Sequence, residues 1–515
     1  MHSYANTYCI RIQSVLAIHL SAALTTLQNT AGTGPKALIA GSTSRNGNTG
    51  PQEASGKDAP NRRNTMREFL KLSVAAGALL ASAALAHAEC GIPAGSVRIL
   101  SNDFEALHVV ARTAEECASP TVKVSKNQTT EHKNIQVAAL TTNPATYTVA
   151  VVANNSVVPL LNAGLVRPLD DLIAKYGQNL TESQLIRIDG KVMAIAFMAN
   201  AQHLHYRKDI LEKAGLQPPK SYEDVLAAAK VIREKNLVAN PLAANFKPGY
   251  DLAAEFINMY AGYGGEFFEP GTAKLAIDNE KGVKALEMMK AMSGYMSPDF
   301  ITYNTNAIKP IWEAGQAAIL NAWGSRAAAM IDKAGPAPEI AANTVLAAAP
   351  TVGGGKIPAA MLWWDGFVIA KNISQEDAEA SFRAMMHGTS PEVAKKHATV
   401  AAWLIKGYQP TPAAVGVFET LKGGAKPYPM LPYMGLLHTA LGDGLAQFMQ
   451  GQESAKQALS DVTQAYNTAA KGGGFLNLPA FEPNAYGEGG GLPPSDQTES
   501  RIVDDGVAAC RIKPF

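Results

Sequence analysis

The residues that could do chemistry are amides, carboxylates and large aromatic rings that lie at or near the ends of apolar, strand-like runs. Trp323 and Ser325 end the run 318–326, and Trp364 and Asp365 lie within the run 361–370. Their polar counterparts are Asn102, Asp103, Asn154, Asn155, Asn200 and Gln202. Aromatic faces pack against the C–H side of a sugar ring, and amides and carboxylates pair with its hydroxyls. The set therefore predicts binding of a neutral polar molecule.

Signatures of catalysis and of metal binding are missing from the chain after about residue 89. That part has no H-E-x-x-H, G-x-S-x-G, S-x-x-K or Walker loop, and no complete G-x-G-x-x-G. It also has no C-x-x-C pair or histidine cluster with the spacing of metal ligands. We expect no catalytic residue, no metal and no cofactor.

Several of the candidates have a purely structural alternative. Trp363 and Trp364 point to opposite faces of one strand, so one of them belongs to a core; Trp364, beside Asp365, is our choice for the binding site. Trp312 and Trp403 are assigned to packing. The polar segment 198–203 interrupts an apolar run, and this favours a binding role for Asn200.

The elements that must position these residues alternate between strand and helix. Strands are expected at 97–101, 122–125 and 147–152, with helices at 105–116 and 131–140. This alternation predicts an α/β fold with parallel strands. Ligands of such sheets bind at the carboxyl ends of the strands, which places the polar residues at 102–103 and 154–155 on one rim.

The stretch 189–215, DGKVMAIAFMANAQHLHYRKDILEKAG, runs strand, polar crossing, strand and helix. It resembles the hinge of extracellular solute-binding proteins, family 1, the sugar-binding components of ABC importers. The stretch 159–176 (PLLNAGLVRPLDDLIAKY), the GYGG at 262–265 and the closing GQESAKQAL resemble other family motifs. Together the matching stretches cover about residues 92–475.

The resemblance implies two α/β lobes with mainly parallel sheets, joined by a multi-strand hinge around a central cleft. Lobe 1 is expected at 89–203 plus 345–408 and lobe 2 at 204–344 plus 409–478, with crossings near 198–206, 343–350 and 405–412. It also implies stacking roles for Tyr250 and Tyr433, ligand capture by hinge closure, and delivery to a membrane permease. Polyamine or iron binding on the same fold, and a secreted hydrolase, remain alternatives.

Bulk properties agree with a two-lobed binding protein. The net charge of +1 gives no reason to expect a nucleic-acid partner, and we expect a monomer. Residues 66–88 have the positive start, apolar core and A-H-A end of a signal peptide, which predicts export to the periplasm. Residues 1–65 are expected to be disordered or a mis-assigned extension, and 479–515 a disordered tail. An uncleaved apolar helix is the alternative to the signal peptide.

Two cysteines, Cys90 and Cys117, lie just before the first strand and at the end of the first helix. In an oxidising periplasm this position favours a disulfide between them. Two free buried thiols are the alternative.

Overall fold

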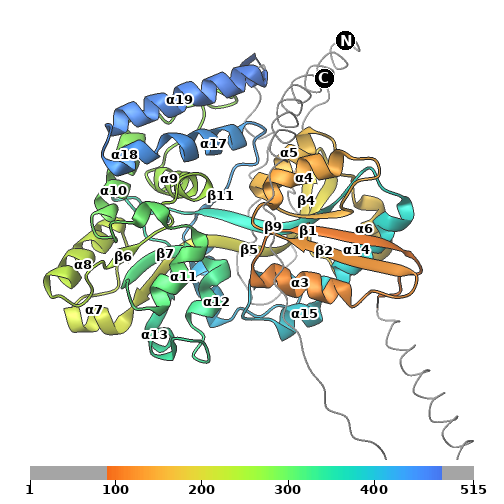
Figure 1. Ribbon diagram of the computed structural model, residues 1–515, viewed down its shortest axis with the longest axis horizontal. Coiled ribbons are helices and arrows are strands. Elements are labelled where there is room, and N and C mark those ends of the chain that lie inside the picture. Colours follow the sequence, from red (N-terminus) through yellow and green to blue (C-terminus); the bar gives the residue numbers. More distant parts are fainter. Residues whose placement is uncertain (1–89, 478–515) are drawn as a thin grey trace, which may run out of the picture. The chain divides into compact units, whose positions relative to one another are not determined.

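The computed structural model describes residues 90–477 (Figure 1). The predicted signal peptide, the extension before it and the tail from 479 lie outside the described residues, so those assignments stay predictions. All described residues fall in one compact unit. None of the helices described here is long and apolar enough to cross a membrane.

Two strands, β5 (Lys191–Arg207) and β9 (Met361–Ile369), run from one lobe into the other (Figure 1). Lobe 1 is built from the following elements. They are β1 (Gly95–Ser101), α3 (Glu105–Glu115), β2 (Val122–Gln128), α4 (His132–Thr141), β3 (Val149–Ala153), α5 (Asn154–Asn162), α6 (Asp170–Tyr176), β4 (Leu185–Ile188), α14 (Gln375–Gly388), α15 (Pro391–Lys396) and β10 (Ala402–Trp403).

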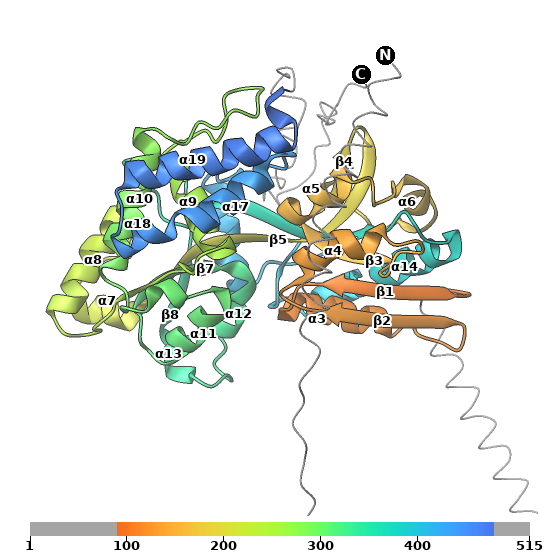
Figure 2. The same cartoon turned by 45° about the horizontal axis from the view of Figure 1, so that its top comes forward.

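Lobe 2 contains more helices than lobe 1 and has shorter strands of its own (Figure 2). Its elements are α7 (Lys208–Ala214), α8 (Tyr222–Glu234), β6 (Leu242–Ala243), α9 (Tyr250–Gly262), α10 (Glu280–Ser293), α11 (Thr305–Glu313), β7 (Ile319–Trp323), α12 (Ala327–Met330), α13 (Pro338–Asn343), β8 (Thr344–Ala347), α16 (Val415–Lys422), β11 (Lys426–Pro427), α17 (Met434–Gly444), α18 (Ala446–Gln450) and α19 (Ala455–Gly472).

The strands form one continuous sheet with the order β2-β1-β3-β9-β5-β7-β6. In lobe 1, β1 pairs with β2 and β3 in parallel, and in lobe 2, β6 pairs with β7 in parallel. The antiparallel pairs between strands of the described residues all include β5 or β9. The predicted two-lobed α/β fold is therefore confirmed, with the antiparallel pairing located at the crossing strands.

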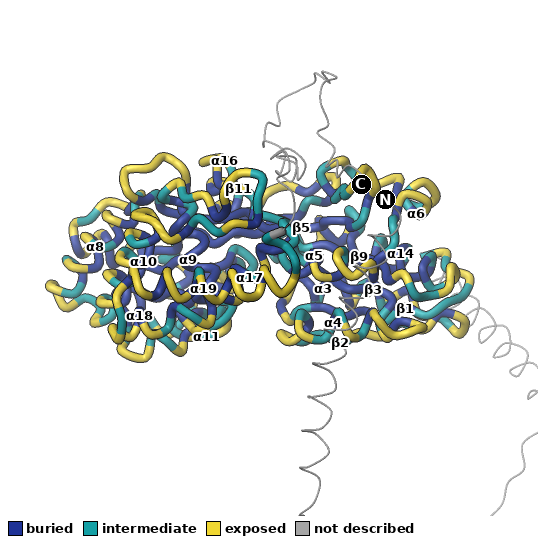
Figure 3. The backbone as a smooth tube through the Cα atoms, turned by 90° about the horizontal axis from the view of Figure 1, so that it is seen from above, coloured by how far each residue is buried: buried dark blue, intermediate teal, exposed yellow. Residues whose placement is uncertain are grey.

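Each lobe has its own apolar core. In lobe 1 one cluster lies between the sheet and helices α3 and α14, and a second lies on the other face under α4 and α5. Lobe 2 has a single larger cluster, through which helix α9 passes almost completely buried. Beyond Met193 every residue of β5 is buried, because both lobes pack on it (Figure 3).

Local chemistry explains where several elements begin and end. Asp189 and Gly190 both have positive φ, 52° and 76°, and make the two-residue turn between β4 and β5. The Ser221 hydroxyl caps α8 by accepting the amide N–H of Asp224 at 3.1 Å, and the Asp224 carboxylate accepts the N–H of Ser221 at 3.0 Å. Both features follow from the sequence.

The crossings differ from the prediction in two ways. The polar segment 198–203 was expected to separate two strands, but β5 continues through it because β9 and β7 supply partners in turn. The segment 343–350 was expected to lead back into lobe 1, but its strand β8 pairs with the lobe 2 end of β5. The return crossing is made by β9, so residues up to about Trp363 pack with lobe 2.

A disulfide joins Cys90 to Cys117, with 5.5 Å between the Cα atoms and 27 residues of sequence separation. We predict that Cys117→Ser lowers the free energy of unfolding by about 3 kcal/mol, because a loop of this length loses its constraint in the unfolded chain. Urea denaturation of both proteins measures the change. Cys510→Ser is the control and should leave the midpoint unchanged. Equal midpoints for Cys117→Ser and the wild type would contradict the prediction.

Candidate functional site

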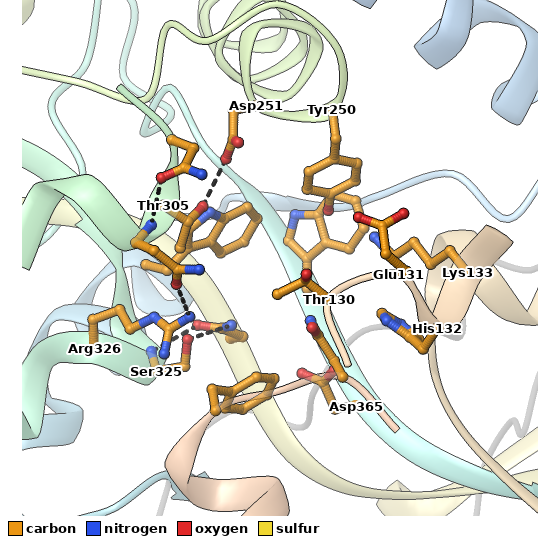
Figure 4. A pocket seen from close by; sticks show the side chains of 18 of the residues that line it. Thr130, Glu131, His132, Lys133, Tyr250, Asp251, Thr305, Ser325, Arg326 and Asp365 are labelled. Atoms are coloured by element: carbon orange, nitrogen blue, oxygen red, sulfur yellow. Dashed lines mark hydrogen bonds between the residues drawn. The ribbon is translucent and has the colours of Figure 1, made fainter. Parts of the chain in front are cut away.

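A cavity of about 500 Å³ is lined by residues of both lobes (Figure 4). Lobe 1 contributes the loop after β1, the loop between β2 and α4 with the first turn of that helix, and the end of β3. Lobe 2 contributes the start of α9, residues 304–306 and the end of β7 with the short turn Gly324–Arg326 that follows it. The crossing strands β5 and β9 add one side chain and two side chains, respectively. A volume of this size is typical of small-molecule sites.

One wall of the cavity is aromatic. The rings of Trp323 and Trp363 meet edge to face with centroids 5.6 Å apart, and Tyr250 meets Trp363 at 6.3 Å. Trp363 is held from behind by Tyr428, whose ring centroid lies 4.2 Å away. Because only 7% of Trp323 and 4% of Trp363 is exposed, these rings are fixed by packing and offer limited faces to the cavity.

Hydrogen bonds between neighbouring side chains hold the polar groups of the cavity in place. The Asn200 amide donates to the Ser325 hydroxyl at 3.3 Å, and the Ser325 backbone N–H donates to the Asn200 Oδ1 at 3.1 Å. This pair connects strand β5 to the turn after β7. The Thr305 hydroxyl donates to Asp251 at 2.6 Å, which fixes that carboxylate at the rim.

Charged groups of both signs line the cavity, and burial shifts the pKa of several of them. Desolvation raises the pKa of Asp365 to about 7, and the nearby Lys133 opposes that rise. Desolvation lowers the pKa of Lys133 to about 8, although Asp365 and Asp251 favour its charged form. The three acidic residues Glu131, Asp251 and Asp365 are matched in number by Lys133, Lys247 and Arg326. This balance favours a ligand without a strong net charge.

Half of the ligand residues proposed from the sequence line this cavity. They are Asn102, Asn200, Tyr250, Trp323, Ser325 and Asp365. They come from five segments that are distant in sequence, and the crossing strands bring them together. Their contact with a ligand remains a proposal.

Trp364 is placed away from the cavity, which corrects our choice between the two neighbouring tryptophans. Trp363 lines the cavity, whereas Trp364 packs in the lobe 1 core on the opposite face of β9. Neighbouring side chains of a strand point to opposite faces, so the sequence predicts that the two tryptophans point apart. Which of them faces the cavity depends on which face of the strand each lobe covers.

Gln202 and Asn154 also lie outside the cavity. Their side chains form hydrogen bonds with backbone groups or with other buried side chains. Gln202 is completely buried within lobe 2. The Asn154 amide donates to the carbonyl of Leu362 at 3.2 Å, and its Oδ1 accepts the N–H of Trp364 at 3.3 Å. Asn154 therefore anchors β9 where this strand passes between the lobes.

The other three proposed ligand residues lie elsewhere. Tyr433 is 1% exposed, and its hydroxyl donates to the carbonyl of Thr272 at 2.8 Å. Asp103 is at the surface, where its carboxylate meets His108 Nε2 at 2.6 Å. Asn155 follows Asn154 in helix α5 and so points about 100° away from it.

Reasoning from the sequence missed several lining residues, above all Thr130, Lys133, Asp251 and Arg326. The strand ahead of Thr130 was expected to end at 125, but β2 continues to Gln128. The rule that ligands bind at the carboxyl ends of parallel strands would have identified the loop of Thr130 had the strand been given its true length.

A buried polar network connects the strands that carry Trp323 and Trp363. The Gln202 Oε1 accepts hydrogen bonds from the amides of Asn258 at 3.1 Å and Asn321 at 2.9 Å. The Asn258 Oδ1 accepts the N–H of Met361 at 2.8 Å, at the start of β9. Nearby, Glu255 accepts from the Asn245 side-chain amide at 2.9 Å. The network connects β5, β7, α9 and β9 at the level of the two tryptophans.

Glu255 gives this network a pH dependence. Burial raises its pKa from 4.5 to about 7, although hydrogen bonds from Asn245 act in the opposite sense. The folded protein therefore holds this proton more tightly than the unfolded chain does. The resulting stability is fully present below pH 4.5 and is lost as the pH rises through about 7.

We predict that this carboxyl changes the free energy of unfolding by roughly 3 kcal/mol between those limits. Urea denaturation at several pH values measures the slope, which Glu255→Gln should reduce. Glu234→Gln, on the exposed face of α8, is the matched control and should retain the wild-type slope. Equal slopes for Glu255→Gln and wild type would contradict the assignment.

Comparison with known proteins agrees with the fold. The chain belongs to the bacterial extracellular solute-binding protein family, whose pattern matches residues 103–395. A probable ABC transporter-binding protein of Deinococcus radiodurans is 26% identical over 266 residues, 50% of this chain and 59% of that protein. The sn-glycerol-3-phosphate-binding periplasmic protein UgpB of Agrobacterium fabrum is 27% identical over 121 residues, 21% of this chain and 28% of that protein. The matches thus span less than two thirds of these curated relatives.

Solved structures share the fold at low identity. Maltose-bound MalE3 of T. maritima superposes with a TM-score of 0.65 at 19% identity, covering 73% of this chain and 100% of that chain. A solute-binding protein of Agrobacterium vitis S4 with bound D-mannitol gives 0.63 at 20% identity, covering 74% and 100%. The family and the fold predicted from the sequence are therefore confirmed.

Proposed function

We propose that this protein captures a sugar or polyol between its lobes by hinge closure and delivers it unchanged to an ABC membrane permease. The observation that carries the proposal is the cavity wall of Tyr250, Trp323 and Trp363, opposed by amides and carboxylates. Rings suit the C–H face of a polyol, and the polar groups suit its hydroxyls. The related structures with maltose and D-mannitol support this ligand class.

We further propose that the protein acts in the periplasm as a monomer after export through the leader at 66–88. Closure would bring the lobe 1 segment 130–134 and the lobe 2 segment 304–306 together around the ligand. The closed form would then present both lobes to the permease.

The rival ligands proposed from the sequence find less support. A polyamine requires a surplus of carboxylates, whereas acidic and basic residues balance around the cavity. Iron binding would use Tyr428 and Tyr433, but the first hydroxyl is 3.1 Å from His438 Nδ1 and the second bonds Thr272. Both hydroxyls therefore already have hydrogen-bond partners within lobe 2.

A thermal-shift screen of the full chain against a library of sugars and polyols tests the proposal. A ligand that binds only the folded protein raises the midpoint by mass action. Calorimetry should then give saturable binding of the hits, with the compound recovered unchanged by chromatography. A library without any stabilising compound, or turnover of a hit, would overturn the proposal.

A further inference from the structure

Two cations reach across the cleft, each from one lobe to an aromatic ring of the other. Lys133 of helix α4 in lobe 1 has its Nζ 3.7 Å from the centroid of the Tyr250 ring, at the start of α9 in lobe 2. Arg326 of lobe 2 has its Cζ 5.6 Å from the centroid of the Phe104 ring, which precedes α3 in lobe 1. Lys133 with Tyr250 and Arg326 lie on opposite sides of the cavity (Figure 4). The two contacts are therefore reciprocal and bracket the site.

Neither cation forms an ion pair with a described residue, although Asp251 and Asp365 lie near enough to Lys133, and Asp103 and Asp251 to Arg326, to favour the charged forms. Within the described part of the chain, no ion pair includes Lys133 or Arg326. Arg326 donates to the Asn306 Oδ1 at 2.9 Å within its own lobe, and its buried Nε has no hydrogen-bond partner among the described residues. A cation over a ring is stabilised most when water is excluded. Each cation thus contacts a ring of the opposite lobe directly.

The two rings are held by their own lobes and cannot follow the cations. Tyr250 stacks on His438 of α17 with centroids 4.6 Å apart, and its backbone carbonyl lies 3.1 Å from His438 Nε2. Phe104 is 7% exposed and belongs to the lobe 1 core. A rotation that separates the lobes beyond the reach of the two cationic side chains therefore breaks both contacts.

We propose that Lys133 and Arg326 are specificity-determining clasps that hold the two lobes together at opposite sides of the cavity and so select compact solutes. The part of this inference that concerns solutes rests on the proposed function. A monosaccharide, a linear polyol or a disaccharide fits within about 500 Å³ with both clasps closed. A longer oligosaccharide must displace one of them.

The clasps are tested first without any ligand. Keto-bearing amino acids at positions 178 and 212, both exposed and in different lobes, allow dye labelling that leaves the cysteines untouched. Single-molecule energy transfer on the full chain then reports the distance between the lobes. Lys133→Met and Arg326→Gln should each raise the ratio of open to closed molecules by roughly two- to thirtyfold, the effect expected of one cation–π contact.

Matched variants distinguish the loss of a cation–ring contact between the lobes from the loss of a positive charge at the cavity. Lys133→Arg and Arg326→Lys keep the cation and should retain most of the closed population. Lys247→Met removes a cation that lines the same cavity from lobe 2, and no ring contact involves Lys247 among residues 90–477. It should leave the distances unchanged. Wild-type distances in both Lys133→Met and Arg326→Gln, or an equal shift in Lys247→Met, would overturn the proposal.

Selection by length is tested with ribitol, D-mannitol, maltose, maltotriose and maltotetraose. Wild-type protein should bind the compact probes at least tenfold more tightly than maltotetraose, and the double variant Lys133→Met/Arg326→Gln should lose most of that preference. A preference that is unchanged in the double variant would overturn the role in selection. If none of the probes binds the wild type, the proposed ligand class fails, while the ligand-free distances still decide whether the clasps exist.

Discussion

Replacing Trp323 with alanine will weaken binding of a sugar or polyol by ten- to a thousandfold, about 1.4 to 4 kcal/mol. The reason is the position of its ring at the cavity, where it meets Trp363 edge to face at 5.6 Å. Truncation removes a ring face and also releases its neighbour, so both lose their fixed orientation. Calorimetry with the best compound from the library measures the change.

Two further substitutions sharpen this test. Trp323→Phe keeps a smaller ring and should lose less affinity than the alanine variant. Trp364→Phe alters the neighbouring tryptophan that packs in the lobe 1 core, so it should lower stability while affinity is retained. Unchanged affinity in Trp323→Ala would remove this residue from the proposed site.

Replacing Gln202 with leucine will lower the free energy of unfolding by about 2 to 6 kcal/mol. The leucine has a similar volume, but it leaves the amides of Asn258 and Asn321 buried without their acceptor. Each unsatisfied donor in a buried network carries the cost of its lost hydration. Urea denaturation with an unchanged m-value measures the loss.

The same variant checks the corrected position of Gln202. Gln178→Leu, at an exposed position in lobe 1, is the matched control and should be nearly neutral. Gln202 is completely buried, so loss of stability should exceed any change in ligand affinity. A variant with full stability and abolished binding would return Gln202 to the list of direct ligand contacts.

The sequence predicted the elements of the fold better than the direction of individual side chains. Where the sequence contains a local signal, the predicted bounds of an element lie close to the observed ones. Examples are α8 with its Ser221 cap and the turn at Asp189 and Gly190. These features depend on neighbours within a few residues. The polar segment 198–203 was misread as a break, because its partners β7 and β9 lie more than a hundred residues further along the chain.

The candidate site shows the same division. Trp323 and Asp365 follow from residue type and strand position, and both line the cavity. The polar side chains of Gln202 and Asn154 suggested ligand binding equally well, but these side chains form hydrogen bonds inside the protein. Lys133 and Arg326 gave no local signal, since their partners are rings in the other lobe. Only the tertiary structure distinguishes a polar residue that serves a ligand from one that serves the fold.

The unbroken strand β5 has a mechanical consequence. Its residues 195, 198–199 and 204–206 each have neighbours on two strands, and residues 200–203 have a neighbour on one, so the stretch 198–206 contains no unpaired residue that could act as a point hinge. Movement between the lobes must then be spread as small changes of the backbone torsion angles over many residues, so that the strand bends elastically. The width of the opened mouth is then limited by elastic stiffness, and the resting geometry is restored without any external input of energy.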